Sequence, residues 1–238
     1  MRRFYSPPEN FVDGSVWLDI DETRHLRHVL RLKRGDEVSV FDGVGKEFRC
    51  EITEITKSVS WLIVAKETVT TSPESPCEIT IAPAVLNGDR YDLIIQKAVE
   101  LGVATLVPLS TIRCDVKPKD AEKRLERWRR IALEATKQCG RAKLMRIAEP
   151  VALDKFIETK KGSVVLFSER AGNDFSTITK GEKITALFGP KGGWDDSELD
   201  AARLNGVNIV TLGGRILRAD TAAIAITAII QHRFGDIE

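Results

Sequence analysis

The last two thirds of the chain alternate short apolar segments with longer stretches of helical periodicity. The apolar segments are residues 78–86, 104–110, 163–169, 184–189 and 208–213. This alternation is typical of α/β domains, because parallel strands need long crossover connections, which helices supply. We therefore expect a mostly parallel sheet with helices in this region.

The first part of the chain has a different pattern. Residues 37–43, 46–55 and 60–67 alternate apolar and polar side chains, and turn residues separate them. Such short alternating runs predict a small β-barrel or sheet. One short helix is expected at residues 22–32.

The composition changes once along the chain, at residues 68–78, where Pro, Ser and Thr cluster between periodic segments. Such clusters are typical of loops and linkers. We therefore place a domain boundary there. The predicted domains are a barrel domain at residues 1–70 and an α/β domain at residues 75–238.

The net charge and the cysteine content limit which partners, metal sites and cellular compartment we expect for this protein. The 36 basic and 35 acidic residues give a net charge of +1, so any nucleic-acid surface must be a local patch. The four cysteines lie far apart, which fits a reducing cytosol and indicates neither a disulfide framework nor a zinc cluster. His25 and His28 alone do not make a metal site, so we expect no metal. The N-terminus lacks the apolar core of a signal peptide, and we expect a cytoplasmic protein.

Two segments concentrate basic residues despite the balanced charge. One is residues 24–34, and the other is residues 113–146, with twelve basic and five acidic residues around a helix expected at 122–140. A single basic face is often only solvated surface, whereas patches in two domains favour contacts with RNA phosphates. The predicted RNA-binding residues are Arg24, Arg27, Arg31, Arg34, Arg127, Arg130 and Arg141.

Two glycine-rich turns each follow an expected strand and precede an expected helix. The first is LFGPKGGWDDSE at residues 187–198, and the second is LGGRILRADTA at residues 212–222. The first lacks the residue order of a P-loop, and the chain has no dinucleotide-binding G-x-G-x-x-G. Because ligands bind beyond the carboxyl ends of strands in open α/β sheets, both turns are expected to border one site. Alternatively the turns are only structural, with Asp195 and Glu198 forming a capping box and Asp220 capping the last helix.

Two further helices of this region have informative sequences. The helix at residues 89–102 is expected to begin with Asp89 as its N-cap and to end at a left-handed Gly102. Residues 221–230 are apolar on every face but only about half as long as a membrane span. We expect a buried helix there, whose second face is covered by the protein interior or by a second subunit.

The two glycine turns, together with QKAVELGV at 96–103, RCDVK at 113–117 and ATKQCGR at 135–141, resemble the RsmE-type 16S ribosomal RNA uracil-N3 methyltransferases of the SPOUT class. Residues 25–43 are similar to the N-terminal RNA-binding segment of that family, so the resemblance covers nearly the whole chain. It implies a PUA-like β-barrel followed by an α/β domain with a deep trefoil knot. It also implies a homodimer.

The chemistry implied by this resemblance is methyl transfer from S-adenosylmethionine to N3 of a uridine in 16S ribosomal RNA. Glu100 is the candidate general base for the N3 proton, or it only pairs with Lys97. Arg113 and Arg218 are candidates to stabilise the anionic uracil. The residues implied to bind the cofactor are Leu187, Phe188, Gly189, Pro190, Gly192, Gly193, Leu212, Gly213, Ile216, Leu217, Arg218, Ala219, Thr221 and Ala222.

The sequence departs from the family pattern at three positions. Lys191 and Asp220 stand where Glu is usual, and Trp194 stands where Phe is usual. Two alternative functions remain open at this point. One is methylation of another RNA nucleotide, and the other is a ribosome-assembly role in RNA binding without catalysis.

Overall fold

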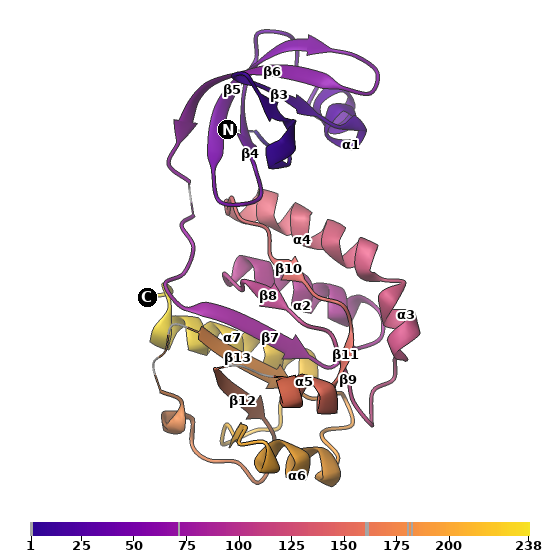
Figure 1. Ribbon diagram of the computed structural model, residues 1–238, viewed down its shortest axis with the longest axis vertical. Helices are drawn as coiled ribbons and strands as arrows, with labels where there is room; N and C mark the ends of the chain where they lie inside the picture. Colours follow the sequence, from indigo (N-terminus) through magenta and orange to yellow (C-terminus); the bar gives the residue numbers. More distant parts are fainter. Residues whose placement is uncertain (1, 71, 160–161, 180, 182) are drawn as a thin grey trace. The chain divides into compact units, whose positions relative to one another are not determined.

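The computed structural model describes residues 2–70, 72–159, 162–179, 181 and 183–238, which form two compact units (Figure 1). The first unit contains Met1–Glu74 and Thr136–Leu144, and the second contains Ser75–Ala135 and Met145–Glu238. Residues 136–144 therefore belong to the first unit, although they fall inside the domain predicted at 75–238. The domain limits 1–70 and 75–238 stay a prediction.

The first unit is built on a six-stranded sheet with the strand order β1-β4-β5-β6-β3-β2. Its strands are β1 (Arg3–Tyr5), β2 (Phe11–Val12), β3 (Ser15–Leu18), β4 (Glu37–Phe41), β5 (Glu47–Ile55) and β6 (Ser60–Thr68). Strands β1 and β4 are parallel, and the other pairs are antiparallel. The apolar residues of the alternating pattern, among them Val38, Ile52 and Leu62, are fully buried in one core with Phe4. The pattern therefore predicted β4, β5 and β6 correctly, whereas β1, β2 and β3 were not predicted.

The helix of the first unit lies slightly earlier than predicted. Helix α1 (Ile20–Arg24) continues into a π-helical turn, η2 (His25–Val29). It begins before residue 22 because the Asp19 carboxylate accepts the amide N–H groups of Asp21 and Glu22 at 3.0 and 2.9 Å. It ends before residue 32 because Arg31 adopts a left-handed backbone with φ 53°.

Arg3 ties residues 136–144 to the sheet of the first unit. Its guanidinium donates to the carbonyls of Thr136, Lys137 and Arg141 at 3.1, 3.0 and 2.9 Å. It also pairs with the Glu47 carboxylate at 3.0 Å, and both side chains are nearly buried. Burial raises the pKa of Glu47, but the hydrogen bonds from Arg3 and Ser39 outweigh it and leave that pKa below its usual value.

The second unit contains a six-stranded, all-parallel sheet with the strand order β10-β8-β7-β13-β12-β14, as predicted. Its strands are β7 (Glu78–Pro83), β8 (Thr105–Leu106), β10 (Arg146–Ile147), β12 (Ser163–Phe167), β13 (Lys183–Phe188) and β14 (Asn208–Val210). The segment 104–110 is two strands rather than one. After β8 the chain leaves this sheet, and β9 (Leu109–Ser110) pairs with β11 (Val151–Ala152) in a small second sheet.

Helices cover both faces of the parallel sheet (Figure 1). The helices are α2 (Asp89–Glu100), α3 (Pro118–Glu122), α4 (Leu125–Cys139), α5 (Leu153–Thr159), α6 (Asp196–Leu204) and α7 (Ala219–Phe234), besides the short 3-10 turn η3 (Phe175–Thr177). The 3-10 turn η1 (Pro8–Asn10) belongs to the first unit. Helices α5 and α6 share a core with Leu187, whereas α2 and α7 pack against Ile81. Ile81 pairs with Ala186, the neighbour of Leu187 in β13, so these helix pairs lie on opposite faces.

Several helix ends differ from the predictions. Gly88, not Asp89, is the N-cap of α2, whereas Gly102 has φ 74° and ends that helix as predicted. The capping box of Asp195 and Glu198 is confirmed. Asp220 does not cap the last helix, because α7 already begins at Ala219. The helix expected at 122–140 corresponds to α4, which begins later, at Leu125, because the separate helix α3 ends at Glu122.

Candidate active site

A cavity of about 1150 Å³ lies at the carboxyl ends of β7, β13, β12 and β14. The two glycine turns meet there, as expected from their positions after strands β13 and β14. The predicted cofactor residues that line the cavity are Gly189, Pro190, Gly192, Gly193, Leu212, Gly213, Ile216, Leu217, Arg218, Ala219 and Ala222.

Three of the predicted cofactor residues do not line the cavity. Leu187 and Phe188 are buried inside β13, and Thr221 is an exposed residue of α7. Part of the cavity wall was not predicted from the sequence. It consists of Phe167, Ser168 and Glu169, which lie at and after the end of β12. The rule that located the two glycine turns would also have found this loop, since it too follows a parallel strand.

The first glycine turn is shaped around Trp194. This indole is buried, and its Nε1 donates to the Phe167 carbonyl at 2.8 Å. A Cβ on Gly189 would lie 3.0 Å from the same ring, so glycine allows the close approach. Trp at this position therefore makes a hydrogen bond to β12 that a Phe side chain could not make, because Phe has no N–H group.

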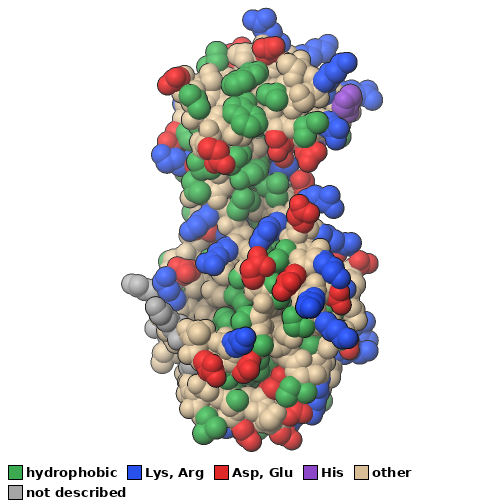
Figure 2. All heavy atoms as spheres, turned by 45° about the vertical axis from the view of Figure 1, so that its right-hand side comes forward, with side chains coloured by type: hydrophobic (Ala, Val, Ile, Leu, Met, Phe, Trp, Pro, Cys, Tyr) green, Lys and Arg blue, Asp and Glu red, His purple; other side chains and the backbone are tan. Residues whose placement is uncertain are grey.

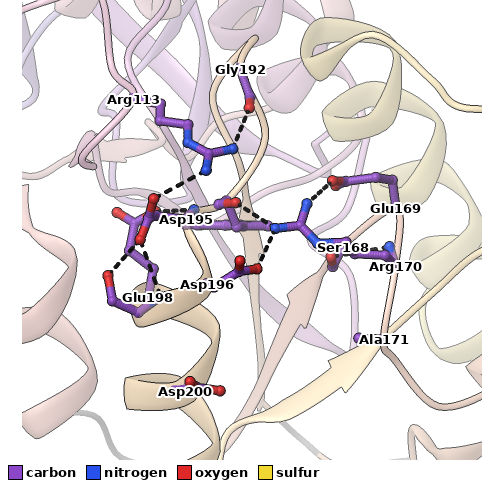
Figure 3. Close-up of polar contacts among 12 residues, drawn as sticks. Arg113, Ser168, Glu169, Arg170, Ala171, Gly192, Asp195, Asp196, Glu198 and Asp200 are labelled. Atoms are coloured by element: carbon purple, nitrogen blue, oxygen red, sulfur yellow. Dashed lines mark hydrogen bonds and ion pairs between the residues drawn. The ribbon is translucent and has the colours of Figure 1, made fainter.

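Arg113 holds the outer side of this turn. Its guanidinium donates to the Gly192 carbonyl and pairs with the Asp195 carboxylate, both at 3.1 Å (Figure 3). Hydrogen bonds from Ser197, and then from Arg113, lower the pKa of Asp195. Arg113 is not among the residues lining the cavity, so its geometry fits a positioning role rather than the predicted contact with uracil.

Arg170 holds the other side of the turn. It donates to the Trp194 carbonyl at 3.0 Å and pairs with Asp196 at 2.8 Å, and it also binds Glu169 (Figure 3). Glu198 completes the arrangement, because its carboxylate accepts the amide N–H groups of Ile112 and Asp195 at 2.8 and 2.9 Å. The turn is thus fixed by side chains from neighbouring loops and α6.

Glu100 is not brought to the cavity, which corrects its assignment as general base. Its carboxylate pairs with Lys97 at 2.8 Å, the alternative considered from the sequence. The cavity involves residues next to the start of α2, whereas Glu100 is the last residue of that helix. A helix of 12 residues spans about 16 Å between its ends. Arg218, by contrast, does line the cavity, as predicted.

The predicted RNA-binding arginines of the first unit differ in their surroundings. Arg24, Arg31 and Arg34 are exposed, and Arg27 donates to the Thr56 carbonyl at 2.9 Å. Arg141 is buried, and its guanidinium pairs with Glu74 at 2.7 Å. Since a buried guanidinium cannot reach RNA phosphate, we remove Arg141 from the RNA-binding set.

Arg127 and Arg130 are exposed on α4, whereas Trp128 of the same helix is buried. Arg127 pairs with Asp92 and lies 3.7 Å from Asp89, both in the first turn of α2. Figure 2 shows Lys and Arg side chains among Asp and Glu side chains on the visible face of the second unit. The basic face of α4 is therefore partly offset by acids.

The described residues were also compared with what a metal site and a membrane-spanning helix require. Residues 2–70, 72–159, 162–179, 181 and 183–238 contain no group of three His, Cys, Asp or Glu side chains suited to a metal ion. Within the same ranges, no helix has both the length and the apolar character that a membrane span requires.

Comparison with known proteins identifies the family. A family profile described as an RNA methyltransferase domain matches residues 73–231, and one described as an RNA methyltransferase PUA domain matches residues 18–59. The Ribosomal RNA small subunit methyltransferase E of Synechocystis is 34% identical over 237 residues, covering 96% of this chain and 77% of that relative. This chain belongs to the ribosomal RNA small subunit methyltransferase E family. The resemblance inferred from the motifs is thereby confirmed.

Solved structures of ribosomal RNA small subunit methyltransferase E and a similar protein match the whole chain. One, from Neisseria gonorrhoeae with bound S-adenosylmethionine, is 34% identical with a TM-score of 0.91 and full coverage of both chains. A methyltransferase from Legionella pneumophila, also with bound cofactor, is 31% identical with a TM-score of 0.91 and covers 99% of each chain. The α/β unit and the PUA-like unit are therefore shared with these proteins.

Proposed function

We propose that this protein is an S-adenosylmethionine-dependent methyltransferase that methylates N3 of a uridine in 16S ribosomal RNA, in the cytoplasm. The observation that carries this proposal is the cavity formed by both glycine turns in a chain that matches cofactor-bound family structures end to end. In the reaction, the sulfur–methyl bond breaks and its electron pair stays on sulfur. The N3–methyl bond forms, and the N3 proton leaves.

The cavity fits a nucleoside-containing cofactor. Added Cβ atoms on Gly213 and Gly214 would meet nothing within 4 Å, so the second turn presents open backbone to the cavity. A Cβ on Gly193 would lie 3.1 Å from the Glu169 carboxylate, so the first turn is close against the β12 loop. Bound S-adenosylmethionine supplies an already activated methyl group, which leaves alignment and exclusion of water to the protein.

Several charged residues that line the cavity are candidates to accept the N3 proton or to stabilise the anion that remains. Arg218 lines the cavity and is proposed to stabilise the uracil anion. Since Glu100 lies elsewhere, the proposed proton acceptor is one of the carboxylates that line the cavity: Asp115, Glu169 and Asp220. Arg113 is proposed to act by positioning the turn at Gly192.

Two finer features of the fold also belong to this proposal. We infer that the sheet of the first unit closes as a PUA-like barrel and that the second unit contains the deep trefoil knot of the SPOUT class. The strand order supports a chain crossing, because β13 pairs between β7 and β12 although it follows β12 in sequence. The motif resemblance supports both features.

A methylation assay on small-subunit RNA tests the proposed function. With radiolabelled S-adenosylmethionine and mass mapping of the product, we expect one methyl group on N3 of one uridine. A methyl group on another nucleotide would support the first alternative function. Tight RNA binding without methyl transfer would support the assembly role.

Basic residues in both units are expected to bind RNA phosphates. Changing Arg31 and Arg34, or Arg127 and Arg130, to Gln should weaken RNA binding and flatten its dependence on salt, by about 0.7–0.9 for each phosphate that is no longer neutralised. The measurement is the slope of log affinity against log salt concentration. A control with Lys155 and Arg203, which are exposed and outside both patches, should keep the wild-type slope. Unchanged slopes in both test variants would remove these patches from the proposal.

We further propose that the protein is a homodimer that uses α7. Within one subunit, α7 buries Ala223, Ile226 and Ile230, while Ile229 is 40% exposed. Leu93, on the adjacent helix α2, is 39% exposed. A second copy covering these side chains would remove apolar surface from water.

Ile229→Glu is therefore expected to dissociate the dimer and to lower methylation with it. Ile226 is unsuitable for this test because it is already buried within the subunit, so a charge there would unfold the protein. Sedimentation at micromolar concentration should show a dimer of the 26.5 kDa chain for wild type and a monomer for Ile229→Glu. Leu204→Glu, at an 88% exposed position of α6, is the control that should stay dimeric. An active wild-type monomer would contradict the dimer.

A further inference from the structure

The cavity extends beyond the two glycine turns. Strands β7, β13, β12 and β14 are consecutive neighbours in the sheet, so their carboxyl ends form one row. The glycine turns follow β13 and β14, whereas Leu86, Asn87 and Arg90, which also line the cavity, come from the chain after β7. The β7 end of the cavity is thus adjacent to the first glycine turn, whereas β14, which the second turn follows, is at the far end of this row of strands.

Asp115 lies at this same end. The neighbouring Cys114 Sγ donates to the Val85 carbonyl at 3.0 Å, which fixes the loop after β9 beside the chain that leaves β7. The whole cavity, at about 1150 Å³, is larger than the roughly 300–1,000 Å³ of pockets that hold one small ligand. The cavity therefore has room for a second ligand beside the cofactor.

Two polar side chains at the β7 end, those of Asn87 and Arg90, do not stabilise the fold by polar contacts within the described part of the chain. Asn87 and Arg90 are exposed, and neither side chain forms a hydrogen bond or an ion pair with any other described residue. Arg113 and Arg170, by contrast, are engaged in holding the first glycine turn. Asn87 and Arg90 therefore present free hydrogen-bond donors where a ligand in the cavity would lie.

The basic face of α4 is next to this end of the cavity. Arg127 approaches Asp89 to 3.7 Å and pairs with Asp92, so the α4 face borders the same helical turn that contains Arg90. A polyanion whose phosphates lie along Arg127 and Arg130 would pass the β7 end of the cavity. One of its nucleotides would enter there.

We propose that the β7 end of the cavity is the binding subsite for the target nucleotide, an unstacked uridine of RNA, and that Asn87 and Arg90 bind its base. This inference rests on the proposed function. The two side chains donate hydrogen bonds to the carbonyl oxygens O2 and O4, on either side of N3. These contacts leave N3 open towards the glycine turn, and the charge of Arg90 favours the base once N3 has lost its proton. A base must leave its stack to enter such a cavity.

The test compares Arg90→Gln and Asn87→Asp with wild type. Each change should lower kcat/KM for small-subunit RNA by about 10- to 100-fold, because a hydrogen bond to the base is removed. The Kd for S-adenosylmethionine, measured by calorimetry, should stay within about twofold of wild type. Arg90→Lys should recover part of the activity, since it restores a charged donor.

Two further measurements separate this subsite from other roles. If Arg90 binds the base, Arg90→Gln keeps the wild-type salt slope of RNA binding, whereas removal of a phosphate-binding group would flatten it and overturn the proposal. Weaker cofactor binding in both variants would also overturn it. Arg203→Gln, at an exposed residue of α6 outside both basic segments, is the matched control and should behave as wild type.

Failure of the subsite and failure of the proposed function give different results. If wild type methylates RNA and both variants match its kcat/KM, only the subsite is wrong. If wild type binds cofactor but methylates no RNA, the proposed function is wrong and the subsite fails with it.

Discussion

Gly193→Val is expected to weaken S-adenosylmethionine binding by about 10- to 100-fold, because φ at Gly193 is 70°, a conformation that a β-branched residue avoids. Its Cβ would also press on the Glu169 carboxylate, 3.1 Å away. Both effects displace the turn that lines the cavity. Calorimetry with the cofactor measures the change.

Gly206→Val is the matched control for this experiment. Gly206 has φ 67°, so the same substitution strains the backbone similarly, but an added Cβ meets nothing within 4 Å. This residue follows α6 and does not line the cavity. We expect Gly206→Val to lower stability and leave the Kd of the folded protein unchanged. Equal affinity in both variants and wild type would refute the cofactor site.

Arg3→Ala is expected to lower the free energy of unfolding of the first unit by about 3–5 kcal/mol, because it leaves a buried carboxylate without its partner. The Glu47 side chain is only 6% exposed, and the carbonyls of Thr136, Lys137 and Arg141 lose the same donor. Urea denaturation measures the decrease. Arg49→Ala removes an exposed ion pair with Glu37 on the same sheet and should change stability little.

The effect of Arg3→Ala should also depend on pH. The pKa of Glu47 is lowered in the folded protein, so its contribution is fully present above its unfolded pKa. This contribution is lost as the pH falls through the folded pKa, because the carboxylate is then protonated in both states. The stability difference between Arg3→Ala and wild type should therefore shrink in acid. A difference independent of pH would show that Glu47 is not the cause.

Periodicity and glycine placement were enough to predict the parallel sheet and the meeting of the two turns. Both features depend on local pattern and on the general rule that parallel strands end at one edge. The roles of single charged residues were not predictable in the same way. Glu100 and Arg141 matched candidate roles by residue type, but Lys97 and Glu74 bind them instead. Of these two partners, only Lys97 lies close in sequence to the residue that it binds, Glu100.

The sequence also did not predict that residues 136–144 belong to the first unit. These residues end α4 and lead into the following loop, so their local pattern is that of the α/β region. Their position depends on contacts across more than a hundred residues, such as Arg3 with Arg141. Periodicity reports only neighbours within a few turns or strands, and it contains no signal for such contacts.

The contribution of residues 136–144 to the first unit constrains how the chain folds during synthesis. Domains generally fold as units while the ribosome extends the chain, N-terminal ones first. Here the contacts of the first unit are complete only after Arg141 has emerged, because until then Arg3 lacks the carbonyls that it binds in the finished protein. The strands and helices between residues 75 and 135 are therefore synthesised before the first unit is complete. A fragment that ends at residue 74 would therefore lack residues 136–144 of the first unit.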